Sequence, residues 1–178
     1  MIITIAGYPG SGKSLVGQLL AKKLNYKYYS IGDMRGEIAR KHGMTIDELN
    51  KVGEKEAWTD VEVDQWQQKL GWEKDNLVMD GRTSFHFIPS SVKVLLKVSW
   101  EEGARRIMAG KARSDEHQAK SIQERVKQSK ARVASDKVRY MKHYGIDPCD
   151  EKNFDVVIDT TTMSPQEVVD AILKMGGL

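Results

Sequence analysis

A phosphate-binding loop near the start of the chain constrains its fold more than any other feature. Residues 7–14 read G-Y-P-G-S-G-K-S and directly follow an apolar run at residues 2–6, so they complete the G-x-x-x-x-G-K-[ST] pattern in its usual context. A strand must deliver such a loop and a helix must leave it, because backbone N–H groups at a helix N-terminus then converge on phosphate oxygens. Apolar residues at helical spacing follow, from residue 15 to 24.

The residue types in this loop suit a polyphosphate ligand. Glycine permits positive φ and lacks the Cβ atom that would keep the chain away from phosphate. In loops of this pattern the lysine, here Lys13, reaches the β- and γ-phosphates, and the hydroxyl of Ser14 ligates Mg²⁺. We therefore expect eight consecutive residues to bind the phosphates: Gly7, Tyr8, Pro9, Gly10, Ser11, Gly12, Lys13 and Ser14.

Five short apolar runs qualify as strands, and helical patterns separate them. They cover residues 2–6, 28–31, 77–79, 92–98 and 156–158. Strands that alternate with helices predict a parallel sheet covered on both faces, with ligands at the carboxyl ends of the strands. At 178 residues the chain fits one domain. We therefore expect an α/β fold, a three-layer αβα sandwich around a five-stranded parallel sheet.

Two intervals between these strands are too long to be simple crossovers. The first covers about residues 33–75 and holds two capping boxes, T-I-D-E at 45–48 and T-D-V-E at 59–62, each of which predicts a helix start. The second covers about residues 111–144, has no Gly or Pro, and is rich in Lys, Arg, Gln and Ala. This composition predicts one or two charged helices, and the first interval predicts a small helical insert.

Arginines recur every seven residues in the second interval. Arg125, Arg132 and Arg139 return to within about 20° of the same helix face, and Asp136 joins that face because it lies four residues after Arg132. Such a face suits phosphates and sugar hydroxyls, because guanidinium groups present paired donors and a carboxylate accepts from ribose. The alternative from spacing alone is a solvent-exposed helix braced by Asp–Arg pairs.

Charged side chains also follow two of the predicted strands. Asp80 and Arg82 follow the third run, and Asp33 and Arg35 follow the second. A carboxylate at the carboxyl end of a core strand lies on the same rim as the phosphate loop, so Asp80 can hold Mg²⁺ or orient Arg82. The alternative is that Asp-Gly at 80–81 is only an ordinary strand exit.

The composition and its distribution restrict the compartment and the partners. No apolar stretch approaches the length of a membrane span and no signal-peptide pattern occurs, so we expect a cytoplasmic protein that does not bind a membrane. The single cysteine, Cys149, cannot form an internal disulfide, which agrees with a reducing compartment. Although the net charge is only +3, residues 111–142 hold ten Lys/Arg against four Asp/Glu. That segment either covers anionic ligands or binds nucleic acid.

Several motifs together resemble the short cytidylate kinases of archaea and some bacteria. They are the phosphate loop, S-I-G-D at 30–33, H-G-M-T at 42–45, D-G-R at 80–82 and above all R-Y-M-K-H-Y-G-I-D at 139–147. The resemblance covers nearly the whole chain in the right order. It implies a nucleoside monophosphate kinase that transfers the γ-phosphoryl group of ATP, with Mg²⁺, to CMP or dCMP. It further implies an acceptor-binding insert at about 33–75 and a lid at about 111–144, and we expect a monomer.

The resemblance also implies roles for individual residues. Arg82 matches the arginine that helps read the acceptor pyrimidine, Arg132 and Asp136 match the pair that holds the acceptor ribose, and Arg139 matches a lid arginine that touches the transferred phosphate. The candidate catalytic residues are therefore Lys13, Arg132 and Arg139. The candidate acceptor-binding residues are Asp33, Arg35, Arg82, Arg132 and Asp136, and the candidate Mg²⁺ ligands are Ser14 and Asp80.

The chain departs from the pattern of that family at two positions. The arginine that usually clamps the acceptor phosphate is replaced by Gly36, and one residue earlier the side chain of Arg35 is turned by about 100° on a helix. We still expect Arg35 to contact that phosphate, because a dianion without a guanidinium on this side is poorly compensated. Gly110 stands where an arginine is usual near the start of the lid, with Lys111 and Arg113 nearby as substitutes.

Two other functions fit the same residues. One is a kinase with the same loop that acts on another acceptor, such as AMP, UMP or a different small molecule. The other is a nucleotide-dependent RNA-binding or regulatory module that uses residues 111–142 as its contact surface. Apart from Tyr140 and Tyr144 the basic segment lacks aromatic residues, and the sequence carries no other RNA-binding signature. This argues against a nucleic-acid partner.

Overall fold

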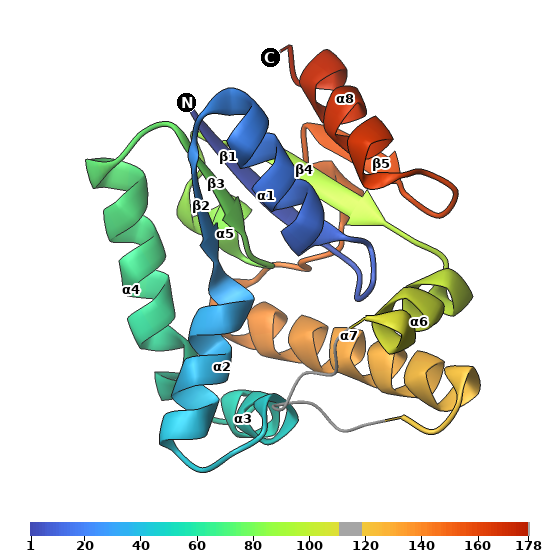
Figure 1. The fold of residues 1–178 in the computed structure, drawn as a ribbon. Helices are drawn as coiled ribbons and strands as arrows, with labels where there is room; N and C mark the ends of the chain where they lie inside the picture. The colour runs from blue at the N-terminus through green and yellow to red at the C-terminus, as the bar shows by residue number, and fades with distance from the viewer. Residues whose placement is uncertain (111–118, 178) are drawn as a thin grey trace.

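A parallel five-stranded sheet forms the centre of the fold. The computed structural model describes residues 1–110 and 119–177, and the strands follow the order β2-β3-β1-β4-β5 (Figure 1). Their bounds are β1 (Ile2–Gly7), β2 (Lys27–Ser30), β3 (Leu77–Asp80), β4 (Val92–Lys97) and β5 (Val156–Asp159). Every predicted strand is present, with its ends shifted by at most one residue, so the predicted parallel sheet is confirmed.

Helices cover both faces of this sheet. Helices α1 (Lys13–Leu24) and α8 (Pro165–Met175) lie side by side on one face (Figure 1), and α2 (Ile31–Lys41), α4 (Trp58–Glu73) and α5 (Ser84–Phe87) cover the other. Because successive side chains of a strand point to opposite faces, Ile3 and Ile5 pack beneath α1 and α8, whereas Ile2 packs against α2 and α4. The predicted three-layer αβα sandwich is therefore confirmed.

The first long interval consists of helices, as its pattern predicts. Helices α2, α3 (Ile46–Gly53) and α4 connect β2 to β3, and a complete capping box at Thr45 starts α3. The second predicted capping box is wrong, because α4 begins at Trp58 and has Ala57 at its N-cap. Thr59 lies in the first turn, beside Asp60, whose carboxylate is buried in an ion pair with Arg35. The Thr59 hydroxyl donates to Asp60 Oδ2 at 3.0 Å instead of capping the helix, so burial of the charged pair competes with the local capping motif.

The second long interval is one helix over its described part. Helix α7 (Ile122–Tyr144) starts after Ser121, whose hydroxyl accepts from the backbone N–H of Glu124 at 3.1 Å, and ends at Gly145, which has a φ of 70°. It passes below the carboxyl ends of the strands (Figure 1) and packs against α6 (Trp100–Ala109) and α3. A short 3-10 helix, η1 (Glu151–Asn153), follows before β5. Gly110 stands where the family usually has an arginine. The two residues expected to replace that arginine, Lys111 and Arg113, lie outside the described residues.

The phosphate loop touches α6 through backbone atoms. A Cβ atom added at Gly10 would lie 2.2 Å from the carbonyl oxygen of Gly103, and one added at Gly103 would lie 2.7 Å from that of Pro9. Neither neighbour is the end of a flexible side chain, so the backbone itself would have to move. Two glycines distant in sequence therefore fix the position of the loop against the helix that follows β4.

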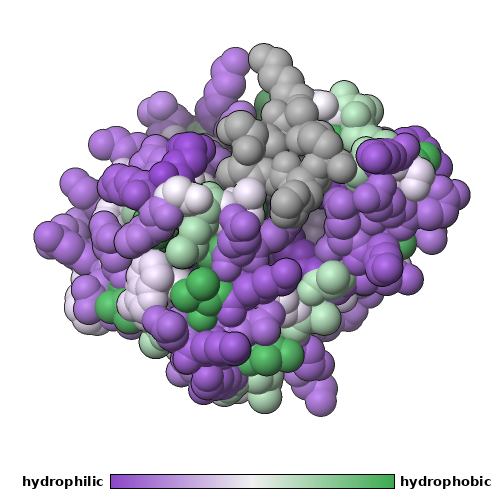
Figure 2. Space-filling view, turned by 90° about the horizontal axis from the view of Figure 1, so that it is seen from below, coloured by the Kyte–Doolittle hydropathy of each residue, from purple (hydrophilic) through white to green (hydrophobic). Residues whose placement is uncertain are grey.

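The face of the molecule that α3 and α7 form is mainly polar (Figure 2). Seen from below, the face over α3 and α7 is largely hydrophilic, with hydrophobic residues scattered singly or in small groups (Figure 2). Scattered apolar residues of this kind are ordinary on a folded protein. Among the described residues, no helix is both long and apolar enough to cross a bilayer.

We expect Gly103→Ala to destabilise the protein although alanine is the better helix former. The added methyl group must displace the carbonyl of Pro9, and overpacking of this kind costs about 1–3 kcal/mol. Gly110→Ala is the matched control, because its Cβ atom would meet no heavy atom closer than 3.5 Å. Urea unfolding of both variants tests this expectation, and equal stabilities would contradict the close contact between loop and helix.

Candidate active site

A cavity of about 680 Å³ lies at the carboxyl ends of β1 and β3, between the phosphate loop and helices α2, α3 and α7. Of the described residues that line it, seven carry a cation and three carry a carboxylate. The cations are Lys13, Arg35, Arg82, Arg106, Arg125, Arg132 and Arg139, and the carboxylates are Asp47, Asp80 and Asp136. Removing cations from water without anions to balance them is costly, so this lining favours an anionic ligand.

The phosphate loop presents backbone donors to this cavity. Gly10 and Gly12 have φ values of 78° and 87°, which glycine adopts without strain. Helix α1 begins at Lys13, and within the described chain no side chain caps it at Gly12. Its first N–H groups are therefore available to an anion, as the sequence predicts for a phosphate site.

The ammonium group of Lys13 lies within this loop. Its Nζ donates to the carbonyl oxygen of Tyr8 at 3.2 Å. The pKa of Lys13 is lowered from 10.5 to about 8. Burial is the main cause; Asp80 acts in the opposite direction, and nearby Arg82 and Arg132 contribute to the lowering. A bound polyphosphate would add negative charge next to Nζ and so favour the protonated form.

Ser14 and Asp80, the two predicted metal ligands, lie together. The Ser14 hydroxyl donates to Asp80 Oδ2 at 2.6 Å, and the Tyr28 hydroxyl donates to the same oxygen at 3.3 Å. The sheet register explains this meeting, because β3 pairs directly with β1 and ends at Asp80 beside the loop. Hydroxyl and carboxylate oxygens are ligands that Mg²⁺ accepts, so the pair fits such an ion. No group of three or more His, Cys, Asp or Glu side chains suited to a metal occurs among the described residues.

The arginine face of α7 turns into the cavity. Arg125, Arg132, Asp136 and Arg139 all line it, and Arg139 and Asp136 are each only 1 % exposed. Arg82, which follows β3, forms an ion pair with Asp136. The alternative of a solvent-exposed, braced helix is therefore wrong for this face.

Arg139 is held by several groups of the protein. Its Nη1 donates to Asn50 Oδ1 at 2.7 Å, and its Nη2 donates to Asp136 Oδ1 at 2.9 Å and to the Tyr140 hydroxyl at 2.6 Å. Gly53 makes room for this guanidinium, since a Cβ atom there would lie 2.9 Å from Arg139 Cδ. Arg139 thus joins α7 to α3 in this structure.

Arg35 lines the cavity, and its guanidinium is bound by groups of α3 and α4. It forms a buried ion pair with Asp60 and donates to the Thr59 carbonyl oxygen at 3.2 Å and to Asn50 Oδ1 at 3.0 Å. Burial and the proximity of Arg139 lower its pKa. The structure does not bring Asp33 to these residues: its side chain is exposed in the first turn of α2, outside the described lining of the cavity.

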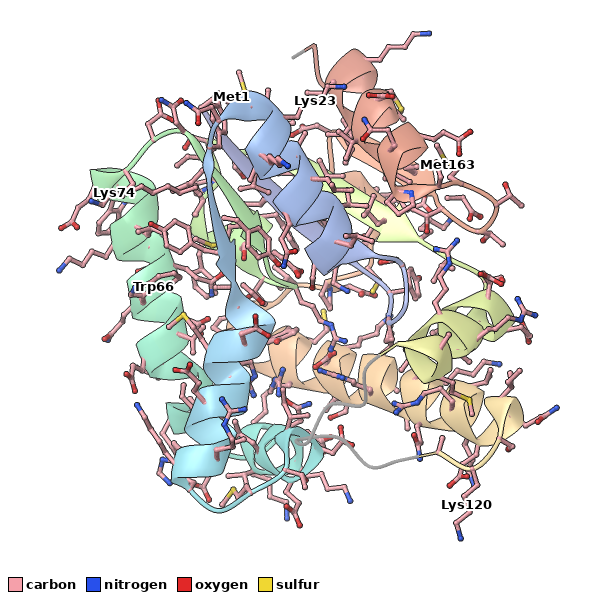
Figure 3. All side chains as sticks on the ribbon, viewed as in Figure 1. Met1, Lys23, Trp66, Lys74, Lys120 and Met163 are labelled. Atoms are coloured by element: carbon pink, nitrogen blue, oxygen red, sulfur yellow. The ribbon has the colours of Figure 1, made fainter. Side chains whose placement is uncertain are left out.

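A second cavity, of about 420 Å³, lies beside the phosphate loop, and no sequence pattern indicates it. Helix α6 contributes Arg106 and Ile107, and the segment that leads into α8 contributes Met163 (Figure 3) and Pro165. The Arg106 guanidinium donates to the carbonyl oxygens of Thr160 at 2.7 Å and Thr161 at 3.1 Å. These contacts tie α6 to the segment after β5, and no local motif marks residues so far apart in the chain.

Comparisons with known proteins find related sequences and a solved structure with the same fold. A cytidylate kinase from Methanococcoides burtonii is 30 % identical, with 98 % of this chain and 95 % of that protein aligned. An S-adenosylmethionine-dependent nucleotide dehydratase from Lacinutrix mariniflava is 35 % identical over 97 % of this chain, which spans only 35 % of that protein. A shikimate kinase structure from Bacteroides thetaiotaomicron shares the fold with a TM-score of 0.69 at 17 % identity, covering 100 % of this chain and 99 % of that one.

The strand order and the phosphate loop place the chain in the class of P-loop kinase folds. Within that class, the model of the cytidylate kinase-like family matches residues 2–162. The chain belongs to the cytidylate kinase-like family, as the sequence motifs predict.

We expect a polyphosphate to bind together with a proton above pH 8. The bound anion raises the pKa of Lys13 from about 8 back toward 10.5, so between these values the complex holds more protons than the free protein and affinity falls as the pH rises. Calorimetric titration with inorganic tripolyphosphate at pH 8.5, in two buffers of different ionisation enthalpy, measures this uptake. Lys13→Met should abolish it, and uptake that persists in the variant would assign the proton to another group.

Proposed function

We propose that the chain transfers the γ-phosphoryl group of ATP to the phosphate of CMP or dCMP. The observation that carries this proposal is the cavity lining, in which seven cations face three carboxylates directly beside a phosphate loop. A triphosphate and a monophosphate brought together supply the negative charge that this lining lacks. Membership in a family of kinases supports the reaction class.

The donor nucleotide fits the loop side of the site. Lys13 and the N–H groups that start α1 would hold the β- and γ-phosphates, and the second cavity, between Arg106 and Met163, would take the base. Ser14 and Asp80 would hold Mg²⁺, which when bound neutralises charge on the phosphates.

The acceptor nucleotide fits the side formed by α2, α3 and α7. Arg82 would read the pyrimidine, Arg132 and Asp136 would hold the ribose, and Arg132 would also stabilise the transferred group. Asp136 already pairs with Arg82, so the side chain proposed for the base and one of those proposed for the ribose hold each other in position. Arg35 and Arg139 both line the cavity, and the groups that hold them, Asp60 for Arg35 and Asn50 and Asp136 for Arg139, would compete with an acceptor phosphate for these guanidiniums.

Phosphoryl transfer asks the protein mainly for position and for charge. No covalent protein intermediate is required, since the acceptor phosphate attacks in line while cations balance the charge that spreads over the transferred group. Lys13, Arg132 and Arg139 are the side chains proposed for this work. Walls of protein on several sides of the cavity limit water, which would otherwise hydrolyse ATP.

The alternatives differ in what the cavity would hold. AMP or UMP fits the same charge pattern, and a relative named for a dehydratase of nucleotides supports a nucleotide ligand without fixing its base. An RNA-binding module is a weaker candidate, because Arg125, Asp136 and Arg139 are buried against the cavity instead of forming an outer surface. Discrimination among monophosphates is therefore the decisive measurement.

We expect CMP and dCMP to be phosphorylated with a higher kcat/KM than AMP, GMP or UMP. A site whose polar groups match one base rejects another strongly, because unmatched groups stay buried without partners. A coupled assay of ADP release across the five monophosphates measures this, with Lys13→Ala as the inactive control. A preference for AMP would refute the cytidylate assignment while leaving a nucleotide kinase.

A further inference from the structure

The side chain of Asn50, on α3, has a fixed orientation. Its Oδ1 accepts from Arg35 Nη2 at 3.0 Å and from Arg139 Nη1 at 2.7 Å. A guanidinium only donates, so the carboxamide oxygen and not its nitrogen must face both arginines. Both arginines are buried and are held by further groups, so the amide cannot flip without losing two hydrogen bonds to cations.

This orientation leaves the Asn50 amide nitrogen facing the other way. The residue is 5 % exposed and lines the cavity, so its remaining accessible surface faces the ligand space. Within the described part of the chain, Nδ2 donates to no acceptor. Two N–H donors are therefore presented from a rigid support at the acceptor side of the cavity.

We propose that Asn50 contributes to acceptor binding by donating a hydrogen bond from Nδ2 to the bound nucleoside monophosphate. This inference rests on the proposed function, and it adds a residue that neither the motif pattern nor the charge pattern indicates. The partner on the ligand is a hydrogen-bond acceptor, either a base carbonyl or ring nitrogen, a sugar oxygen or a phosphate oxygen. A donor held by two buried guanidiniums is preorganised, so little conformational entropy is lost when it binds.

Asn50→Asp separates this role from a structural one. The substitution keeps an oxygen toward Arg35 and Arg139 and replaces only the NH₂ group with a second oxygen, so both tethers remain and the melting temperature should not fall. The N–H donors of Nδ2 are lost, and a carboxylate oxygen then faces the ligand atom that accepts the hydrogen bond in the wild type. We expect KM for the monophosphate to rise about tenfold or more, as loss of a buried hydrogen bond requires, while KM for ATP stays within twofold.

The new carboxylate could also act through its charge, and the chain offers a control for that. Asp47 lies one turn earlier on α3 and lines the same cavity. The double variant Asn50→Asp/Asp47→Asn has the net charge of the wild type but still lacks the Asn50 donor. A monophosphate KM that stays high in the double variant supports the proposal, and a KM restored to the wild-type value overturns it.

The acceptor panel identifies the atom that Asn50 contacts. An equal loss for every monophosphate places the hydrogen bond on the phosphate, a smaller loss for dCMP than for CMP places it on the 2′-oxygen, and a loss confined to one base places it on that base. An unchanged KM for all accepted monophosphates overturns the role of Asn50 while leaving the kinase assignment intact.

Failure of the kinase assignment is recognised separately, by calorimetric titration of CMP without ATP. If the wild type turns over no monophosphate, weaker CMP binding by Asn50→Asp still supports the donor. Equal binding by both proteins, or no binding by the wild type, overturns it.

Discussion

A chain of buried charge contacts holds the parts of this molecule in place. It runs from Arg82 through Asp136 to Arg139, then through the amide of Asn50 to Arg35 and Asp60. These six residues come from α2, α3, α4, α7 and the segment after β3. A buried cation without a partner costs several kcal/mol. The charged residues therefore favour the helix packing in which each of them contacts its partner on the neighbouring element. The apolar core fixes the sheet, but this chain of contacts fixes the side of the cavity that α2, α3 and α7 form.

The chain of contacts also supplies counterions to buried arginines that line the cavity. Asp60 and Asp136 pair with Arg35 and Arg82, so these two buried guanidiniums have counterions within the protein itself. The phosphate loop is positioned by a different device, the backbone contact of Gly10 with Gly103. The two sides of the cavity are thus anchored independently: the loop side by close packing of glycines between the loop and α6, and the side formed by α2, α3 and α7 by pairing of charges between helices.

The sequence was most informative where one local pattern decides the structure. Strand patterns and the phosphate loop predicted the sheet, and the seven-residue spacing of Arg125, Arg132 and Arg139 predicted the helix face that lines the cavity. It was misleading at Thr59, where a capping motif competed with burial of the adjacent Asp60. The partners of Arg35 and the orientation of Asn50 were beyond its reach, because they depend on how α2, α3 and α4 cross in space. Gly103 and the second cavity depend likewise on distant segments, and the roles assigned to the site residues stay predictions.

The excess of cations in the cavity has a practical consequence for the handling of this protein. Charge alone distinguishes poorly between a nucleotide and any other compact anion, and the lining offers the same guanidinium and ammonium donors to sulfate, inorganic phosphate or citrate. We expect such ions in a purification or assay buffer to compete with any anionic ligand for the cavity and to weaken its apparent affinity. Buffers built on zwitterions with chloride as the counterion leave the cavity accessible, and added sulfate then becomes a simple probe of how much of the binding is ionic.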